Sequence, residues 1–155
     1  MNQLLRNGNA KTPAFGGVPD MMLEGSKLRI VIVEDSAIIR ARLAETLAEI
    51  PGAEIVGQVE TENDALAILR QQHWDAVVLD LQLKQGTGLG VLKALGTVVR
   101  PPGAKIIVFT NYDFPQYRER SIGLGADYFF DKAREFHRVR EVLSGMARGP
   151  VPVAH

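Results

Sequence analysis

Residues 28–35 have the sequence LRIVIVED, an apolar run that leads directly into two acidic side chains. Three later runs end in a similar way: AVVL at 76–79 before Asp80, KIIVF at 105–109 before Thr110, and DYFFD at 127–131 before Lys132. Short runs rich in Val and Ile, without polar alternation, are typical of parallel strands buried on both faces. Ligands bind beyond the carboxyl ends of such strands. The sequence therefore predicts one crevice that collects three carboxylates, a hydroxyl and an ammonium group.

Apolar residues at helical spacing separate these runs, and one further strand is expected at about 54–59. Helices are predicted at about 36–50, 61–72, 89–95, 115–124 and 133–146. Five β-α units with short connections predict a doubly wound α/β fold with a parallel five-stranded sheet. The helix at 115–124 is the least apolar, with Tyr117, Ile122 and Leu124 to anchor it. Either it has low local stability suited to an element that moves, or it is a short helix on a solvated edge.

The composition indicates one globular domain. The 155 residues are 46% hydrophobic and 23% charged, with zero net charge and no cysteine. Disulfides and thiolate chemistry are thereby excluded, and no overall positive field favours nucleic acid or an anionic membrane. We expect a folded domain at 27–147, a flexible N-terminal extension at 1–26 and a flexible tail at 148–155. No apolar stretch is long enough to span a bilayer and no signal peptide is evident, so we expect a cytoplasmic protein.

The acidic residues suggest a cation. Glu34 and Asp35 near Asp80 would concentrate negative charge, which is costly unless a cation neutralises it. Hard oxygen ligands suit Mg²⁺, and Mn²⁺ is an alternative. Singly, each residue has an ordinary structural explanation, such as helix N-terminal charge, a strand-end cap or a solvated lysine. Their occurrence together favours a site.

Four segments resemble the receiver domains of response regulators, over about residues 28–146. They are VEDSAIIR at 33–40, VVLDLQLKQGTG at 77–88, IIVFTN at 106–111 and GADYFFDK at 125–132. The resemblance implies the flavodoxin-like fold of CheY-like domains. It also implies that Asp80 accepts a phosphoryl group and that Mg²⁺ is held by Glu34, Asp35, Asp80 and the backbone carbonyl of Gln82.

The same resemblance assigns a conformational response. Thr110 and Lys132 would contact the acquired phosphoryl group, and Phe129 would be the aromatic switch that moves inward with Thr110. Gln82 and Tyr112 occupy positions that tune self-hydrolysis in the family, and we expect both to hinder the attacking water. Lys84 and Ala133 stand where many relatives have proline, and neither position supplies chemistry.

The expected partners follow from this role. A histidine kinase or phosphotransfer protein would supply the phosphoryl group, and the domain would be no enzyme beyond assisting its own phosphorylation and slow dephosphorylation. Few residues follow Met146, so we expect output to a separate target protein or through a phosphorylation-dependent dimer of an otherwise monomeric chain. The helix at 115–124, the strand at 128–130 and the last helix form the expected docking face.

Other functions are less well supported by the residues. Acids follow the first strand where a dinucleotide site needs glycines. The arginines of the docking face alternate with acids, which favours a salt-bridged surface over nucleic-acid binding. A receiver-like scaffold that acts without phosphorylation is the alternative to the phosphoacceptor role.

Overall fold

The computed structural model describes residues 27–149 of the chain. Five parallel strands form one sheet, as predicted, and their order is β2-β1-β3-β4-β5. The strands are β1 (Leu28–Val33), β2 (Ala53–Val59), β3 (Ala76–Leu79), β4 (Lys105–Thr110) and β5 (Tyr128–Asp131). The predictions of flexible termini at 1–26 and 148–155 fall outside these residues, apart from Arg148 and Gly149.

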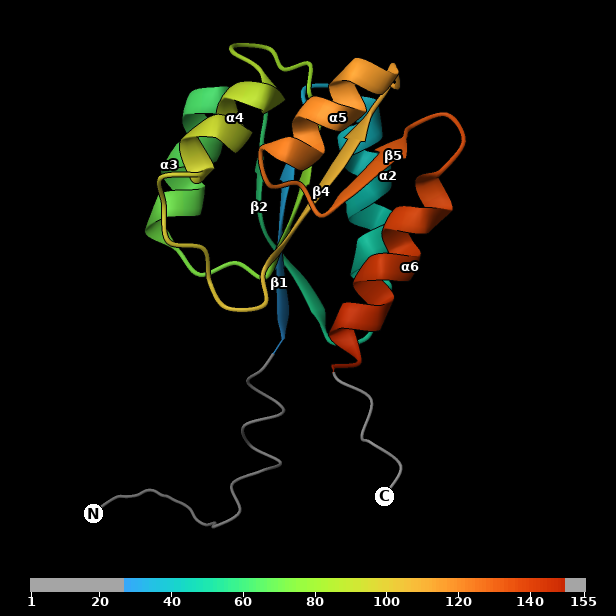
Figure 1. Cartoon of the computed structure of the whole chain (residues 1–155). Coiled ribbons are helices and arrows are strands. Elements are labelled where there is room, and N and C mark those ends of the chain that lie inside the picture. The colour runs from blue at the N-terminus through green and yellow to red at the C-terminus, as the bar shows by residue number, and fades with distance from the viewer. Residues whose placement is uncertain (1–26, 150–155) are drawn as a thin grey trace, which may run out of the picture.

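Helices cover both faces of the sheet (Figure 1). They are α2 (Ala37–Ala48), α3 (Glu62–Gln71), α4 (Gly88–Leu95), α5 (Pro115–Gly123) and α6 (Phe136–Ala147). α2 and α6 lie on one face, and α3, α4 and α5 lie on the other (Figure 1). Ser36 and Thr61 cap α2 and α3, each accepting a hydrogen bond from a backbone N–H of the first turn. No helix in this part of the chain has the length and apolarity to cross a bilayer.

Alternate residues of the central strands enter two separate cores. Val31 and Val33 face the core beneath α3, α4 and α5, whereas Ile30 and Ile32 face the core beneath α2 and α6. All four are fully buried. Burial of a side chain of this size is worth about 1.5–3 kcal/mol. Both faces therefore require apolar residues, which explains why the strands lack polar alternation.

Two local predictions were wrong. The last helix begins at Phe136 instead of 133, because Glu135 accepts a hydrogen bond from the Asp131 N–H and donates its own N–H to the Asp131 carbonyl. These bonds hold the intervening residues in a turn. In α5, Ile122 is 45% exposed and does not anchor the helix, whereas the polar Ser121 is fully buried.

Candidate functional site

The parallel register brings the predicted residues to one edge of the sheet. Val33 pairs with Leu79, and Thr110 pairs with Asp131. The backbone N–H of Asp80 donates to the carbonyl of Val33 at 3.0 Å. The N–H of Lys132 likewise donates to the carbonyl of Thr110 at 3.0 Å. Each functional side chain thus lies at, or directly after, the carboxyl end of a strand that is hydrogen-bonded to its neighbour.

Lys132 lies at the centre of the site. Its Nζ is 2.7 Å from Oε1 of Glu34 and 2.8 Å from Oδ2 of Asp80. The three side chains are between 2% and 9% exposed, so water screens their charges poorly. One ammonium group therefore compensates two buried carboxylates.

Burial and these contacts change the pKa values of Glu34 and Lys132. Burial raises the pKa of Glu34 to about 7 from its ordinary 4.5, and the hydrogen bonds from Lys132 and the Ser36 N–H only partly oppose this rise. Burial on its own would lower the pKa of Lys132. Hydrogen bonds to Asp80 and Glu34 outweigh burial and raise the pKa of Lys132 above its ordinary value. The lysine is accordingly charged at neutral pH.

Asp35 completes an acidic cluster. One carboxylate oxygen from each of Glu34, Asp35 and Asp80 lies within 4.8 Å of the other two. The backbone N–H of Gln82 donates to Oδ1 of Asp80 at 3.3 Å, while the Gln82 side chain is exposed. Three hard oxygen donors at this spacing match the ligand preference of a small divalent cation.

Thr110, Tyr112 and Phe129 lie beside the cluster. Thr110 is 1% exposed, and its Oγ1 accepts a hydrogen bond from the backbone N–H of Tyr112 at 3.1 Å. The Tyr112 ring stacks on Tyr117 of α5, with ring centroids 5.3 Å apart. Phe129 is 4% exposed. The structure therefore has the Phe129 ring buried in the core beneath α3, α4 and α5.

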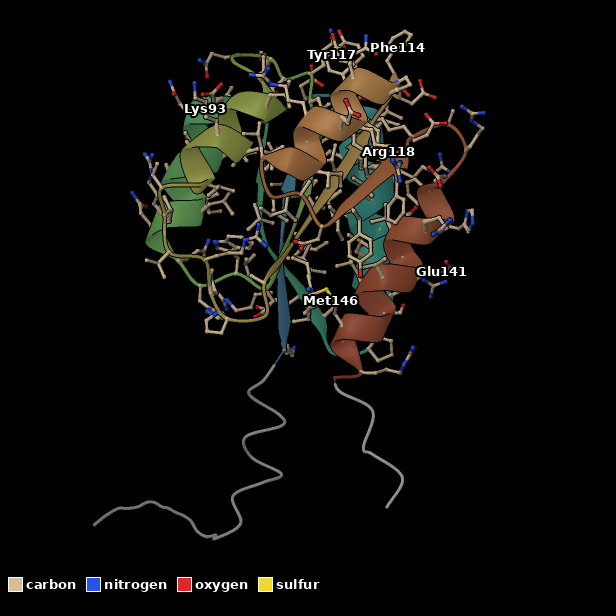
Figure 2. All side chains as sticks on the ribbon, in the orientation of Figure 1. Lys93, Phe114, Tyr117, Arg118, Glu141 and Met146 are labelled. Atoms are coloured by element: carbon tan, nitrogen blue, oxygen red, sulfur yellow. The ribbon has the colours of Figure 1, made fainter. Side chains whose placement is uncertain are left out.

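Two arginines make contacts that were not predicted. Arg118 donates from Nη1 to the Phe129 carbonyl at 3.2 Å, and Figure 2 shows it on the side of α5 that faces β5. Arg134 lies 2.8 Å from Asp113 and 2.9 Å from Asp131, which joins the loop after β4 to the loop after β5. The sequence identified both only as members of a charged surface. Their partners are distant along the chain, apart from the Arg134–Asp131 pair, so no local spacing pointed to them.

The fold is that of a receiver domain. The family model of the response regulator receiver domain matches residues 30–144. The chain belongs to that family.

A curated relative matches over most of this chain, and solved structures share its fold. The chain is 28% identical over 115 residues to a protein-glutamate methylesterase/protein-glutamine glutaminase of Methanospirillum hungatei, an alignment covering 74% of this chain and 34% of that protein. The signal receiver domain of NarL from Mycobacterium tuberculosis has a TM-score of 0.71 at 19% identity, covering 81% of this chain and 99% of that domain. A Burkholderia pseudomallei response regulator, solved with a phosphorylated aspartic acid and a calcium ion, has a TM-score of 0.65 at 21% identity, covering 82% and 78%. The chain spans about a third of the curated relative's length.

Proposed function

We propose that this receiver domain accepts a phosphoryl group on Asp80 from a histidine kinase or phosphotransfer protein. The observation that carries the proposal is the position of Lys132, whose Nζ contacts both Asp80 and Glu34 at the edge of the sheet. A cation beside a buried carboxylate neutralises the charge that accumulates during phosphoryl transfer. The phosphorylated aspartic acid in the Burkholderia pseudomallei relative supports the same chemistry here.

The acidic cluster fits Mg²⁺, with Mn²⁺ as a substitute. Glu34, Asp35 and Asp80 supply oxygen donors within 4.8 Å of one another, and the carbonyl of Gln82 is the fourth proposed ligand. Burial is the main cause of the raised pKa of Glu34, and the charge of Asp80 adds to it, so a cation at the cluster would favour the ionised carboxylate. A bound divalent cation would withdraw charge from the phosphoryl oxygens.

The side chains of the site have separate roles in phosphoryl transfer. An oxygen of Asp80 bonds to phosphorus as the bond from phosphorus to the donor's imidazole nitrogen breaks, and the electron pair leaves with that nitrogen. Lys132 holds its ammonium at the acceptor carboxylate. Thr110 offers a hydroxyl from the adjacent strand end. Gln82 and Tyr112 hinder the water that would release phosphate, which slows dephosphorylation of the domain. The proposed chemistry is confined to the domain's own phosphorylation and slow dephosphorylation.

The conformational response to phosphorylation involves Phe129 and reaches the surface of the domain. Thr110 and Phe129 lie on neighbouring strands, since Val108 pairs with Phe129 and Thr110 with Asp131. A phosphoryl group adds about two negative charges, enough to draw Thr110 and Lys132 inward. The α5-β5-α6 face would present that change to a separate target protein or to a second copy of the domain.

Phosphorylation by a small donor tests this proposal. Incubation with acetyl phosphate and Mg²⁺, followed by intact-mass measurement, should add one phosphoryl group. Asp80→Asn should abolish the adduct, and Asp75→Asn, at the opposite end of β3, should retain it. If the wild type acquires no adduct, the phosphoacceptor role is wrong and the phosphorylation-independent scaffold becomes the better account.

A further inference from the structure

Glu62, the first residue of α3, reaches across to the start of α4. Its Oε1 accepts a hydrogen bond from the backbone N–H of Thr87 at 2.9 Å. Its own backbone N–H donates to the carbonyl of Gln85 at 2.8 Å. The two helices lie side by side (Figure 1). Glu62 therefore forms hydrogen bonds on both sides of Gly86, with Thr87 through its carboxylate and with Gln85 through its backbone N–H.

Glycines in the segment QGTGLG, residues 85–90, provide the room for this side chain. A Cβ added at Gly86 would collide with the Cβ and carboxylate of Glu62, and one added at Gly90 would collide with the carboxylate. Gly86 also has a φ of +76°, which disfavours a side chain independently. The space above the glycines is thus filled by a carboxylate from another helix.

The segment held by Glu62 packs on the backbone of the proposed phosphoacceptor and the residue after it. Gly88 donates its N–H to the carbonyl of Leu81 at 2.9 Å, and a Cβ at Gly88 would collide with the Asp80 carbonyl oxygen. The first turn of α4 therefore rests on the backbone of Asp80 and Leu81. A shift of that turn would displace the backbone on which Asp80 and the Gln82 carbonyl depend.

We infer that Glu62 is a positioning residue for phosphoryl transfer, fixing the backbone from Asp80 to Gln82 through the start of α4. The inference rests on the proposed phosphoacceptor function. A misplacement of about 1 Å at a reacting group slows a reaction substantially. A purely structural role for Glu62 would lower stability without changing the phosphorylation rate of the folded protein.

Four variants test the inference: Glu62→Ala, Glu62→Gln, Gly90→Ala, and the double variant Glu62→Ala/Gly90→Ala. The rate of adduct formation with acetyl phosphate and saturating Mg²⁺ would be measured well below the melting temperature. Glu62→Ala should slow it about three- to tenfold. Glu62→Gln should retain most of the rate because its amide oxygen also accepts from Thr87. Asp64→Ala, which removes a carboxylate from the same helical turn, should match the wild type.

Gly90→Ala disturbs the position of the Glu62 carboxylate from the α4 side. The added methyl group displaces the Glu62 carboxylate, so the single variant should slow phosphorylation about as much as Glu62→Ala. In the double variant the methyl group occupies vacated space, and the rate should fall no further. Its melting temperature should exceed that of Glu62→Ala, because alanine is favoured over glycine inside a helix.

Hydrogen exchange in EDTA gives a readout that needs neither metal nor phosphate. Amides of residues 81–88 should exchange faster in Glu62→Ala and Gly90→Ala than in the wild type. A wild-type rate in Glu62→Ala, or an equal loss in Glu62→Gln, would overturn the positioning role while leaving the phosphoacceptor function intact. A wild type that forms no adduct would instead reject that function, and this inference with it.

Discussion

Arg118 lies over the ring of Phe129, with its guanidinium carbon 5.6 Å from the ring centroid, and donates a hydrogen bond to the Phe129 carbonyl at 3.2 Å. One side chain thus contacts both the ring and the backbone of the residue we propose as the switch. Elsewhere α5 is held mainly by the stack of Tyr117 on Tyr112, because its N-terminus lacks a side-chain cap and Ser121 is its only fully buried residue. Arg118 is therefore a principal link between α5 and β5.

Replacing Arg118 with alanine should loosen α5. Loss of the hydrogen bond and the cation–π contact should speed amide exchange over residues 115–123 by about two- to tenfold. Hydrogen-exchange mass spectrometry measures this directly. Arg120→Ala is the matched control, since the Arg120 side chain makes no hydrogen bond or ion pair within residues 27–149. Equal effects of the two variants would show that Arg118 has no special contact with β5.

Ser121→Ala should stabilise the same helix. Within residues 27–149, the Ser121 Oγ is the buried side-chain polar atom without a hydrogen-bond partner. Removing an unsatisfied hydroxyl and gaining helix propensity should raise the free energy of unfolding by about 1 kcal/mol. Urea denaturation would measure the change. Ser144→Ala on α6 gains only the propensity and should give a smaller increase. A destabilised Ser121→Ala protein would contradict this account.

The sheet and the position of the site could both be predicted from the sequence. Buried Val and Ile runs are confined to strands here, and the residue after each run necessarily lies at the carboxyl edge. Glu34, Asp80 and Lys132 were therefore predicted together and are in contact. Their roles in phosphoryl transfer stay predictions.

Contacts between residues far apart in the sequence could not be predicted from local sequence patterns. Glu62 is an unremarkable helix-start residue until the fold places it against Gly86 and Gly90. Ser121 interrupts the apolar pattern, so the buried side of α5 was assigned to Ile122. Arg134 meets Asp113 only because two loops converge at the edge of the sheet. Such pairings depend on tertiary proximity, which spacing along the chain does not encode.

Lys132→Met should be strongly destabilising without metal. It leaves Glu34 and Asp80 buried without their common cation, a loss of about 3 kcal/mol. Urea denaturation in EDTA would measure it, and saturating Mg²⁺ should restore at least half of the loss by neutralising the same carboxylates. Lys84→Met removes an ammonium that is 72% exposed and 3.7 Å from Glu60, and should cost less than about 1 kcal/mol. Failure of Mg²⁺ to stabilise Lys132→Met more than the wild type would argue against a metal at the cluster.

The pKa of Glu34 predicts a pH-dependent stability in EDTA. It is about 7 in the folded protein against an ordinary 4.5, so between these values the folded chain retains a proton that the unfolded chain has lost. The stabilisation from Glu34 is therefore complete below about pH 4.5 and is lost as the pH rises through about 7. Glu34→Gln does not titrate and should flatten the fall in unfolding free energy over this range. The exposed control Glu45→Gln should keep the wild-type slope, and an unchanged slope in Glu34→Gln would refute the assignment.

The lifetime of the phosphorylated state should depend on Gln82 and Tyr112. Gln82 has an exposed side chain two residues after Asp80, and Tyr112 is held by its stack on Tyr117 and its N–H bond to Thr110. If both restrict the approach of water to the phosphoryl group, Gln82→Ala/Tyr112→Ala should lose phosphate about three- to tenfold faster, the range expected when one or two weak contacts are removed. Intact-mass measurement after removal of the donor would follow the decay. Lys84→Ala, in the same loop as Gln82, should decay at the wild-type rate. An unchanged lifetime in the double variant would place control of hydrolysis in other residues of the site.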